Sequence, residues 1–458
     1  MGLLNAINDF VWGIPALILT VGVGLYISFR TGFVQLRLFP KAFKSFCQKL
    51  KATHNTGDGV SAYQALCTAL AATVGTGNLA GVAGSIALGG PGSIFWMWIC
   101  AALGMATKLA EAALAVRYRT RNADGEVVGG PMYMISSGLH RRWHWLAGTY
   151  CFFGVVAAFG VGNATQINTV IGGVNSVITS FGGMPTMATN LLVGSLMAVL
   201  IGVLLSGGAK RIGKVAERLV PLAAIFYILL CIGVLLVRSD QIPSAFLAIF
   251  EGVYSPRAAT GGMLGSAFIA LRVGASRGVF TNEAGMGTAS IAHAAAKVDH
   301  PVEQGLMGMI EVFLDTIVIC TLTALVILCS GVPITYGADL GIVLTANAFS
   351  AVYGHWVSVP LTVALCCFAI ATVLGWGLYG LRCAQYLLGC KVRKLFVYLQ
   401  IVTVIIGSVL GTGVIWLLAE IVNGLMAIPN LVVLVLLSPE LFRLLQDYKR
   451  SPIFRSGS

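Results

Sequence analysis

The most constraining feature of this sequence is an uncharged stretch from Ser61 to Leu88. It holds no Lys, Arg, Asp, Glu or His and is long enough to cross a bilayer as a helix. Gly75 and Gly77 interrupt its middle, and glycine is a poor helix former. In lipid, a broken helix is tolerated only where it faces protein or a cavity, because every backbone polar group needs a partner. The unpaired N–H groups and carbonyls at such a break suit a carboxylate and a cation, so the stretch predicts half of a transport site.

Two other interpretations of these glycines remain open. Gly77 and Gly81 are four residues apart, and small residues at that spacing also let two membrane helices pack closely. A Gly-x-Gly pattern can belong to a dinucleotide-binding loop, but such a loop follows a β-strand, and the flanks here are wholly apolar. The glycines therefore indicate a helix break or a packing surface.

Composition places the whole chain in a membrane. Of 458 residues, 57% are hydrophobic and 10% are charged, whereas soluble domains carry about 25% charged residues. We expect one integral membrane domain over residues 1–458. The net charge of +12 does not by itself indicate a nucleic-acid partner. The sequence has no basic helix interleaved with aromatic residues, which such a partner would require. The 11 cysteines form no C-x-x-C pair, so they predict neither a zinc site nor a disulfide framework.

Eleven apolar spans are expected, and the basic residues support their alternation across the membrane. Of the 29 Lys and Arg residues, 24 lie in segments on one side, and only Arg238 and Arg257 lie on the other. This asymmetry places the N-terminus outside and the C-terminus in the cytoplasm. The spans are expected at 10–29, 61–88, 93–116, 146–178, 187–206, 219–237, 262–281, 305–330, 355–381, 395–419 and 424–441.

Eleven spans divide into one extra N-terminal helix (10–29) and two sets of five. The first set covers 61–237 and the second covers 262–441. An odd number of helices per set gives the sets opposite orientations, which is an inverted repeat. The repeat predicts that span 262–281 is also interrupted, at Gly274 and Gly278. The segment 282–304 after it is expected to form a short helix at the cytoplasmic face.

Polar residues in the fourth and ninth spans are candidates for contact with a transported solute. Asn163, Gln166 and Asn168 are costly in lipid and should point into the protein, either to bond neighbouring helices or to contact substrate. Gln166 can reach a carboxylate or an ammonium group. In the ninth span, the Thr372 hydroxyl can ligate sodium beside the carbonyls of the broken helix. The Trp376 indole can limit a small side-chain pocket or simply pack.

The ionisable residues inside the spans look structural. Lys108 and Glu111 are three residues apart and can pair on one helix. Glu311 and Asp315 share a helix face. An intramembrane acid is a cation or proton site by default, so Asp315 either couples or gates transport or pairs with Arg272 or Arg277.

Two other classes of protein fit the sequence less well. No nucleophile–His–acid spacing stands out, so the chain is not expected to be an enzyme. A channel needs a continuous lined pore, typically from symmetric subunits, and saturable sodium-dependent uptake would exclude it.

The sequence resembles the sodium:alanine (alanine/glycine:cation) symporter family over nearly its whole length. The motifs that carry the resemblance are VGTGNLAGVAGSIALGGPGSIFWMW, GGPMYM, NEAGMGTASIAHAAAKVDHPVEQG and ATVLGW. The resemblance implies sodium-coupled uptake of alanine or glycine in the inner (plasma) membrane of a prokaryote. It implies no cofactor besides the co-transported Na⁺, and no partners beyond substrate, Na⁺ and membrane lipid. It also implies the five-plus-five inverted repeat of the leucine-transporter type.

The resemblance further suggests which residues form the binding pocket. The substrate carboxylate would lie near the amides of Gly75, Thr76 and Gly77. The rest of the pocket would come from Asn78, Gln166, Thr372 and Trp376. By analogy with the wider fold, the carbonyls of Ala71 and Val74, with Thr372, would hold sodium.

Overall fold

The computed structural model describes residues 2–12, 14–51, 60–255, 267–338, 341–410 and 412–456. In this part of the chain nearly all regular structure is helical, and β1 and β2 form a single antiparallel hairpin. The helices and strands are α1 (Gly2–Val11), α2 (Ile14–Thr31), α3 (Val34–Arg37), α4 (Phe39–Lys51), α5 (Ala62–Thr73), η1 (Gly77–Gly81), α6 (Val82–Gly89), α7 (Gly92–Arg117), β1 (Thr120–Arg121), β2 (Val127–Val128), α8 (Pro131–Gly138), α9 (Trp145–Phe159), η3 (Gly160–Ala164), α10 (Thr165–Ser180), α11 (Met187–Ser206), α12 (Gly208–Val237), α13 (Ile242–Tyr254), α15 (Ala267–Asn282), α16 (Thr288–His293), α17 (Pro301–Val312), η5 (Phe313–Cys320), α18 (Thr321–Cys329), α19 (Gly341–Tyr353), α20 (Ser358–Leu388), α21 (Arg393–Val409), α22 (Thr412–Leu436), α23 (Ser438–Arg450) and α24 (Pro452–Ser456). Short 3₁₀ turns occur at η2 (Arg141–Trp143), η4 (Ser239–Gln241), η6 (His355–Val357) and η7 (Cys390–Val392), and η1, η3 and η5 are π-helical.

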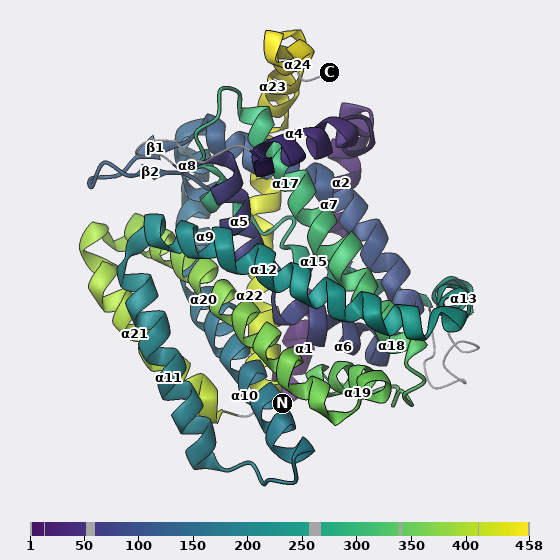
Figure 1. The fold of residues 1–458 in the computed structure, drawn as a ribbon. Coiled ribbons are helices and arrows are strands. Elements are labelled where there is room, and N and C mark those ends of the chain that lie inside the picture. The colour runs from purple at the N-terminus through teal and green to yellow at the C-terminus, as the bar shows by residue number, and fades with distance from the viewer. Residues whose placement is uncertain are drawn as a thin grey trace.

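The helices form a bundle suited to a membrane. Eight helical segments of the described residues are long and apolar enough to span it, and the bent pair Ala62–Thr73 and Gly77–Gly89 is a ninth. Pro15–Thr31 and Gly341–Tyr353 are shorter apolar helices. The end with α1 lies opposite the end from which α23 and α24 project (Figure 1). The predicted all-α membrane fold is therefore confirmed, and the count of eleven spans stays a prediction.

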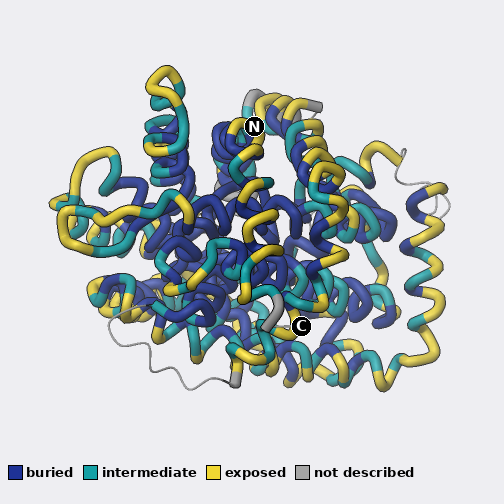
Figure 2. Tube along the Cα trace, turned by 90° about the horizontal axis from the view of Figure 1, so that it is seen from above, coloured by how far each residue is buried: buried dark blue, intermediate teal, exposed yellow. Residues whose placement is uncertain are grey.

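Burial follows the pattern expected for a bundle in lipid. Buried residues concentrate in the centre of the molecule and exposed ones lie around its edge (Figure 2). Large apolar side chains are exposed along the outer faces of α11 and α12, among them Leu196, Val199 and Leu229. These faces suit the acyl chains of lipids, which are as apolar as leucine.

The uncharged stretch forms a broken helix, as predicted. α5 begins with a capping box in which the Ser61 hydroxyl accepts from the Gln64 backbone N–H, and the Gln64 side chain accepts from the Ser61 N–H. α5 ends at Thr73 because Val74 has an extended backbone, with φ −75° and ψ 98°. The chain then bends by 50° into the second half of the span.

The interruption predicted at Gly274 and Gly278 is wrong, because α15 is continuous through both. Gly274 instead brings α15 close to α7, since a Cβ on it would lie 2.3 Å from the Ser93 carbonyl oxygen. The helical path breaks later, after α15 ends, where Gly285 and Gly287 adopt φ values of 95° and 75°. α16 follows this break and is buried throughout. The short helix expected in 282–304 is present as α16, and its position at the cytoplasmic face stays a prediction.

The boundary between the last two predicted spans, 395–419 and 424–441, is also wrong. α22 begins at Thr412, so Glu420 lies inside a membrane helix. Its Oε1 is 2.8 Å from Nη1 of Arg277 on α15. This pairing removes the cost of an isolated carboxylate, and it joins segments that are far apart in the sequence.

Candidate functional site

The first helix break presents carbonyl groups at the end of α5. The last four carbonyls of a helix lack partners within it, and at α5 these include the buried Ala71 and Val74. The Gly75 N–H donates to Oδ1 of Asn78, 2.8 Å away, so this predicted carboxylate-binding amide already has a partner.

The other side of the break begins the next helical turn. The first N–H groups of a helix have no acceptor inside it and carry its positive dipole end. Thr76 and Gly77 occupy this position, and both are buried. The break therefore sets carbonyl oxygens on one side and amide N–H groups on the other.

Two side chains from other helices converge on Gly75. A Cβ placed on this glycine would lie 2.6 Å from Oγ1 of Thr372 and 3.5 Å from Oε1 of Gln166. Both oxygens are buried without a hydrogen-bond partner among the described residues, and so is Oγ1 of Thr76. An unpaired buried polar atom costs roughly 1–3 kcal/mol. Three such oxygens at one helix break indicate a site built for a polar ligand.

Trp376 lies one helical turn beyond Thr372 on α20 and is 1% exposed. It packs against Gly162 of η3, where an added Cβ would lie 2.2 Å from Cβ of Trp376. The indole therefore fills the space between α20 and η3. This position fits the predicted pocket wall and also fits tight packing.

Phe280 and Thr281, which are not among the predicted site residues, also reach the first break. A Cβ on Gly77 would lie 3.2 Å from Cγ2 of Thr281 and 3.4 Å from Cδ1 of Phe280. They belong to the last turn of α15, directly before the second break. The two breaks occupy corresponding positions in the two sets of five spans. This correspondence is the sequence signal that points to Phe280 and Thr281, provided that the second break is placed after α15.

Asp315 contacts the first break through Asn78. The Asn78 side-chain Nδ2 donates to Oδ1 of Asp315 at 2.7 Å and to its backbone carbonyl at 3.2 Å. Oδ2 of Asp315 accepts from the Thr316 hydroxyl at 2.7 Å. The Asp315 carboxylate thus bonds Asn78 and Thr316 rather than the predicted Arg272 or Arg277, and Arg277 pairs with Glu420. Asp315 is fully buried, and its carboxylate is held by an amide and a hydroxyl.

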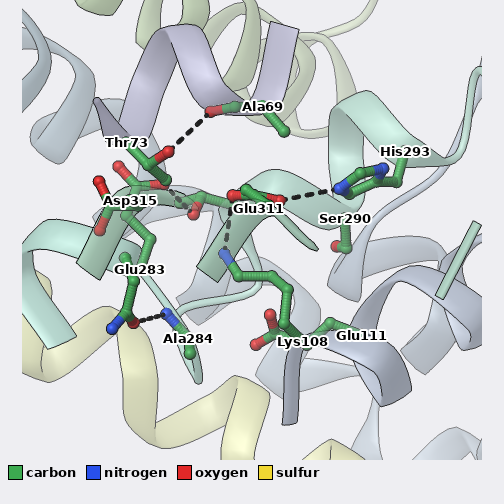
Figure 3. A network of polar contacts seen from close by, with 12 residues as sticks. Ala69, Thr73, Lys108, Glu111, Glu283, Ala284, Ser290, His293, Glu311 and Asp315 are labelled. Atoms are coloured by element: carbon green, nitrogen blue, oxygen red, sulfur yellow. Dashed lines mark hydrogen bonds and ion pairs between the residues drawn. The ribbon is translucent and has the colours of Figure 1, made fainter. Parts of the chain in front are cut away.

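A second polar network lies beside the second break (Figure 3). Lys108 Nζ is 3.2 Å from Oε1 of Glu311, and Nε2 of His293 is 2.9 Å from the other carboxylate oxygen. Nδ1 of His293 is 2.6 Å from Nε2 of Gln304. The predicted pairing of Lys108 with Glu111 on one helix is therefore wrong, since Lys108 instead joins α7 to α17.

Glu111 holds the second break itself. Its Oε1 accepts from the backbone N–H groups of Gly285 and Gly287 at 2.9 and 3.0 Å, and from Nδ2 of Asn430 at 2.7 Å. Glu111 thus satisfies donors that the break in the helical path has released. The side chain of a buried acid on α7 stabilises the turn between α15 and α16.

Two of the predicted polar residues bond neighbouring helices. Asn163 donates to the backbone carbonyl of Gln400 at 2.9 Å and also to its side-chain oxygen. Asn168 donates to the carbonyl of Leu410 at 2.8 Å. Asn163 thus joins η3 to α21, and Asn168 joins α10 to the residue directly after α21. Of the two interpretations of these side chains, bonding between helices is the one observed.

The candidate site is closed on every side. Gln166, Thr372 and Trp376 are at most 3% exposed, and the break itself is buried. α19 covers η1, and the Thr345 hydroxyl donates to the Leu79 carbonyl at 2.9 Å. A solute can enter or leave only when helices move.

Comparisons with known proteins agree on the class of protein. The chain is 43% identical to the sodium/alanine symporter AgcS of Methanococcus maripaludis over 442 residues, covering 96% of this chain and 95% of the relative. It is 36% identical to the probable sodium/glutamine symporter GlnT of Bacillus subtilis, covering 97% and 89%. The crystal structure of MhsT in complex with L-phenylalanine has the same fold, with a TM-score of 0.60 at 12% identity over 83% of this chain and 90% of that one. The model of the sodium:alanine symporter family matches residues 1–454, and the chain therefore belongs to this family.

Proposed function

We propose that this protein carries alanine or glycine into the cytoplasm together with Na⁺. The single observation that carries the proposal is the convergence of Thr372 and Gln166 on the broken helix at Gly75, with side-chain oxygens that have no partner among the described residues. Membership of the sodium:alanine symporter family supports coupling to sodium. The protein acts as a transporter and not as an enzyme.

The substrate carboxylate is proposed to lie at the N–H groups of Thr76 and Gly77. Gln166 would contact its polar groups, and Asn78 would fix the break by holding Gly75 and Asp315 together. The relatives' names include alanine and glutamine. The small distances at Gly75 and Gly162 favour the smaller substrate, because Thr372 and Trp376 leave little room beside them.

Sodium is proposed to bind the carbonyls of Ala71 and Val74 with the Thr372 hydroxyl. All three are buried, and Thr372 reaches the break at Gly75. Hard cations of this kind take oxygen ligands. Sodium would stabilise the same break that binds the substrate, so each would raise the affinity of the other.

Transport is proposed to follow alternating access in a five-plus-five inverted repeat, with residues 10–29 as the extra helix and 61–237 and 262–441 as the two repeats. A break after α5 and a second break after α15 support this division. The proposed orientation in the inner membrane has the N-terminus outside and the C-terminus in the cytoplasm. It rests on the asymmetry of Lys and Arg, and α1 and α24 lie at opposite ends of the bundle (Figure 1).

Uptake into proteoliposomes tests the proposal. Radiolabelled alanine and glycine should accumulate with an inward Na⁺ gradient and not with an equal K⁺ gradient. Uptake that ignores the cation would contradict the sodium ligands named above. Absence of uptake by folded protein would mean that the substrate is wrong, and binding of other small amino acids would then identify it.

A further inference from the structure

A pocket of about 870 Å³ opens at the end of the bundle that carries α4, away from both helix breaks. Its walls come from the first half of α12, the first turn of α5 and the end of α4, including Leu50. Arg211, Lys214 and Arg218 line it from α12 and are exposed. None of the substrate or sodium residues proposed above belongs to it.

The three cations form the head of a longer stripe on one face of α12. Residues three or four apart in a helix lie on the same face, and the stripe continues after Arg218 with Leu222, Ile225 and Leu229. These three side chains are 69%, 58% and 61% exposed. From Arg218 to Leu229 the helix rises about 16 Å, which is close to the length of an acyl chain. The face is thus basic at one end and apolar along the rest.

The charges in the pocket favour an anion. Glu217 is the one acid among the residues that the structure describes as lining it, against three cations. Its Oε2 accepts from Nε2 of Gln64 on α5 at 2.8 Å. Arg211 is held in place by donating to the Val203 carbonyl at 3.0 Å. The cations belong to a segment that the asymmetry of Lys and Arg assigns to the cytoplasmic side, where anionic lipids concentrate.

From this arrangement we propose that the pocket binds one anionic phospholipid. The phosphate-bearing headgroup contacts Arg211, Lys214 and Arg218, and an acyl chain lies along Leu222, Ile225 and Leu229. The headgroup lies beside the hydrogen bond between Gln64 and Glu217, so the bound lipid joins α5, the first half of the broken span, to α12. The site is separate from the proposed transport site and does not depend on which solute is carried.

Native mass spectrometry of the full chain in neutral detergent tests the proposal. Dioleoyl phosphatidylglycerol should bind one copy with clear preference over dioleoyl phosphatidylcholine. Each cation near a lipid surface contributes about five-fold to affinity, so the triple variant Arg211→Gln, Lys214→Gln, Arg218→Gln should bind about 100-fold more weakly. Size-exclusion chromatography checks that the variants are folded, and the single variant Lys214→Gln, with an expected loss of about five-fold, provides a milder test.

A matched control removes three exposed cations from the same predicted side but outside the pocket: Arg141→Gln, Arg142→Gln, Lys394→Gln. It should keep phosphatidylglycerol binding within two-fold. Equal losses in both triple variants would overturn the proposal in favour of general surface charge. Competition by inorganic phosphate or glycerol phosphate at the same concentration as the lipid would also overturn it, because the acyl chain would then add nothing.

Discussion

At the scale of single residues, Thr372 carries the clearest prediction. Thr372→Val keeps the shape of the side chain and removes the hydroxyl, so sodium would lose a ligand beside Gly75. We expect the apparent affinity for Na⁺ in alanine uptake to fall at least ten-fold, a loss of about 1.4 kcal/mol. Thr372→Ser is the matched control and should retain sodium dependence. Equal sodium dependence in the valine variant and the wild type would remove Thr372 from the sodium site.

Trp376 makes a separate prediction about selectivity. Trp376→Phe shortens the wall beside Gly162, and the space that it opens should admit larger side chains. One methylene in an apolar pocket is worth about 1–3 kcal/mol of discrimination, so the ratio of alanine to leucine uptake should fall roughly ten-fold or more. Competition of unlabelled leucine with labelled alanine measures this ratio. An unchanged ratio in folded protein would mean that Trp376 only packs.

At the scale of elements, the two basic residues of α7, Lys108 and Arg117, make a matched pair for a stability test. Lys108 is fully buried against Glu311, whereas the Arg117 side chain is 54% exposed beside Glu440. Lys108→Met leaves a buried carboxylate without its lysine, and we expect a loss of about 3–5 kcal/mol. Arg117→Met should cost less than about 1 kcal/mol. Unfolding of both variants in mixed micelles measures the difference, and similar losses would contradict a structural role for the buried pair.

The two helix breaks also show how far the sequence could predict the site. Gly75 and Gly77 located the first break because no charge interrupts the span around them. The same reasoning failed at Gly274, since a glycine that brings two helices together has the same signature as one that breaks a helix. The second break depends on Glu111 accepting from Gly285 and Gly287, a contact between distant segments that local sequence does not contain.

The predicted boundary between the last two spans was wrong for the same reason. The expected spans 395–419 and 424–441 left Glu420 in the connection between them, whereas the structure places it inside α22, paired with Arg277 of α15. Thr372 and Gln166, by contrast, were identifiable individually, because polar residues inside apolar spans are rare and should face the protein. Their meeting at Gly75 required the fold.

At the scale of the whole molecule, the closed site links the two ligands thermodynamically. If sodium and substrate stabilise the same break, sodium should raise the affinity for alanine by some factor, and alanine must raise the affinity for sodium by the same factor. Couplings of this kind typically amount to about 5–150-fold. Alanine binding to purified protein can be measured by calorimetry at saturating Na⁺ and in choline chloride of equal ionic strength, and sodium binding can be measured with and without alanine.

Thr372→Val then separates a shared site from a distant one. Because Thr372 lies at the break itself, losing its hydroxyl should lower the coupling factor toward one in both titrations. A variant that weakens sodium binding while leaving the coupling factor intact would show that the hydroxyl is a ligand without being the link. Alanine affinity that is equal in sodium and choline would contradict a shared helix break altogether, whatever the uptake assay shows.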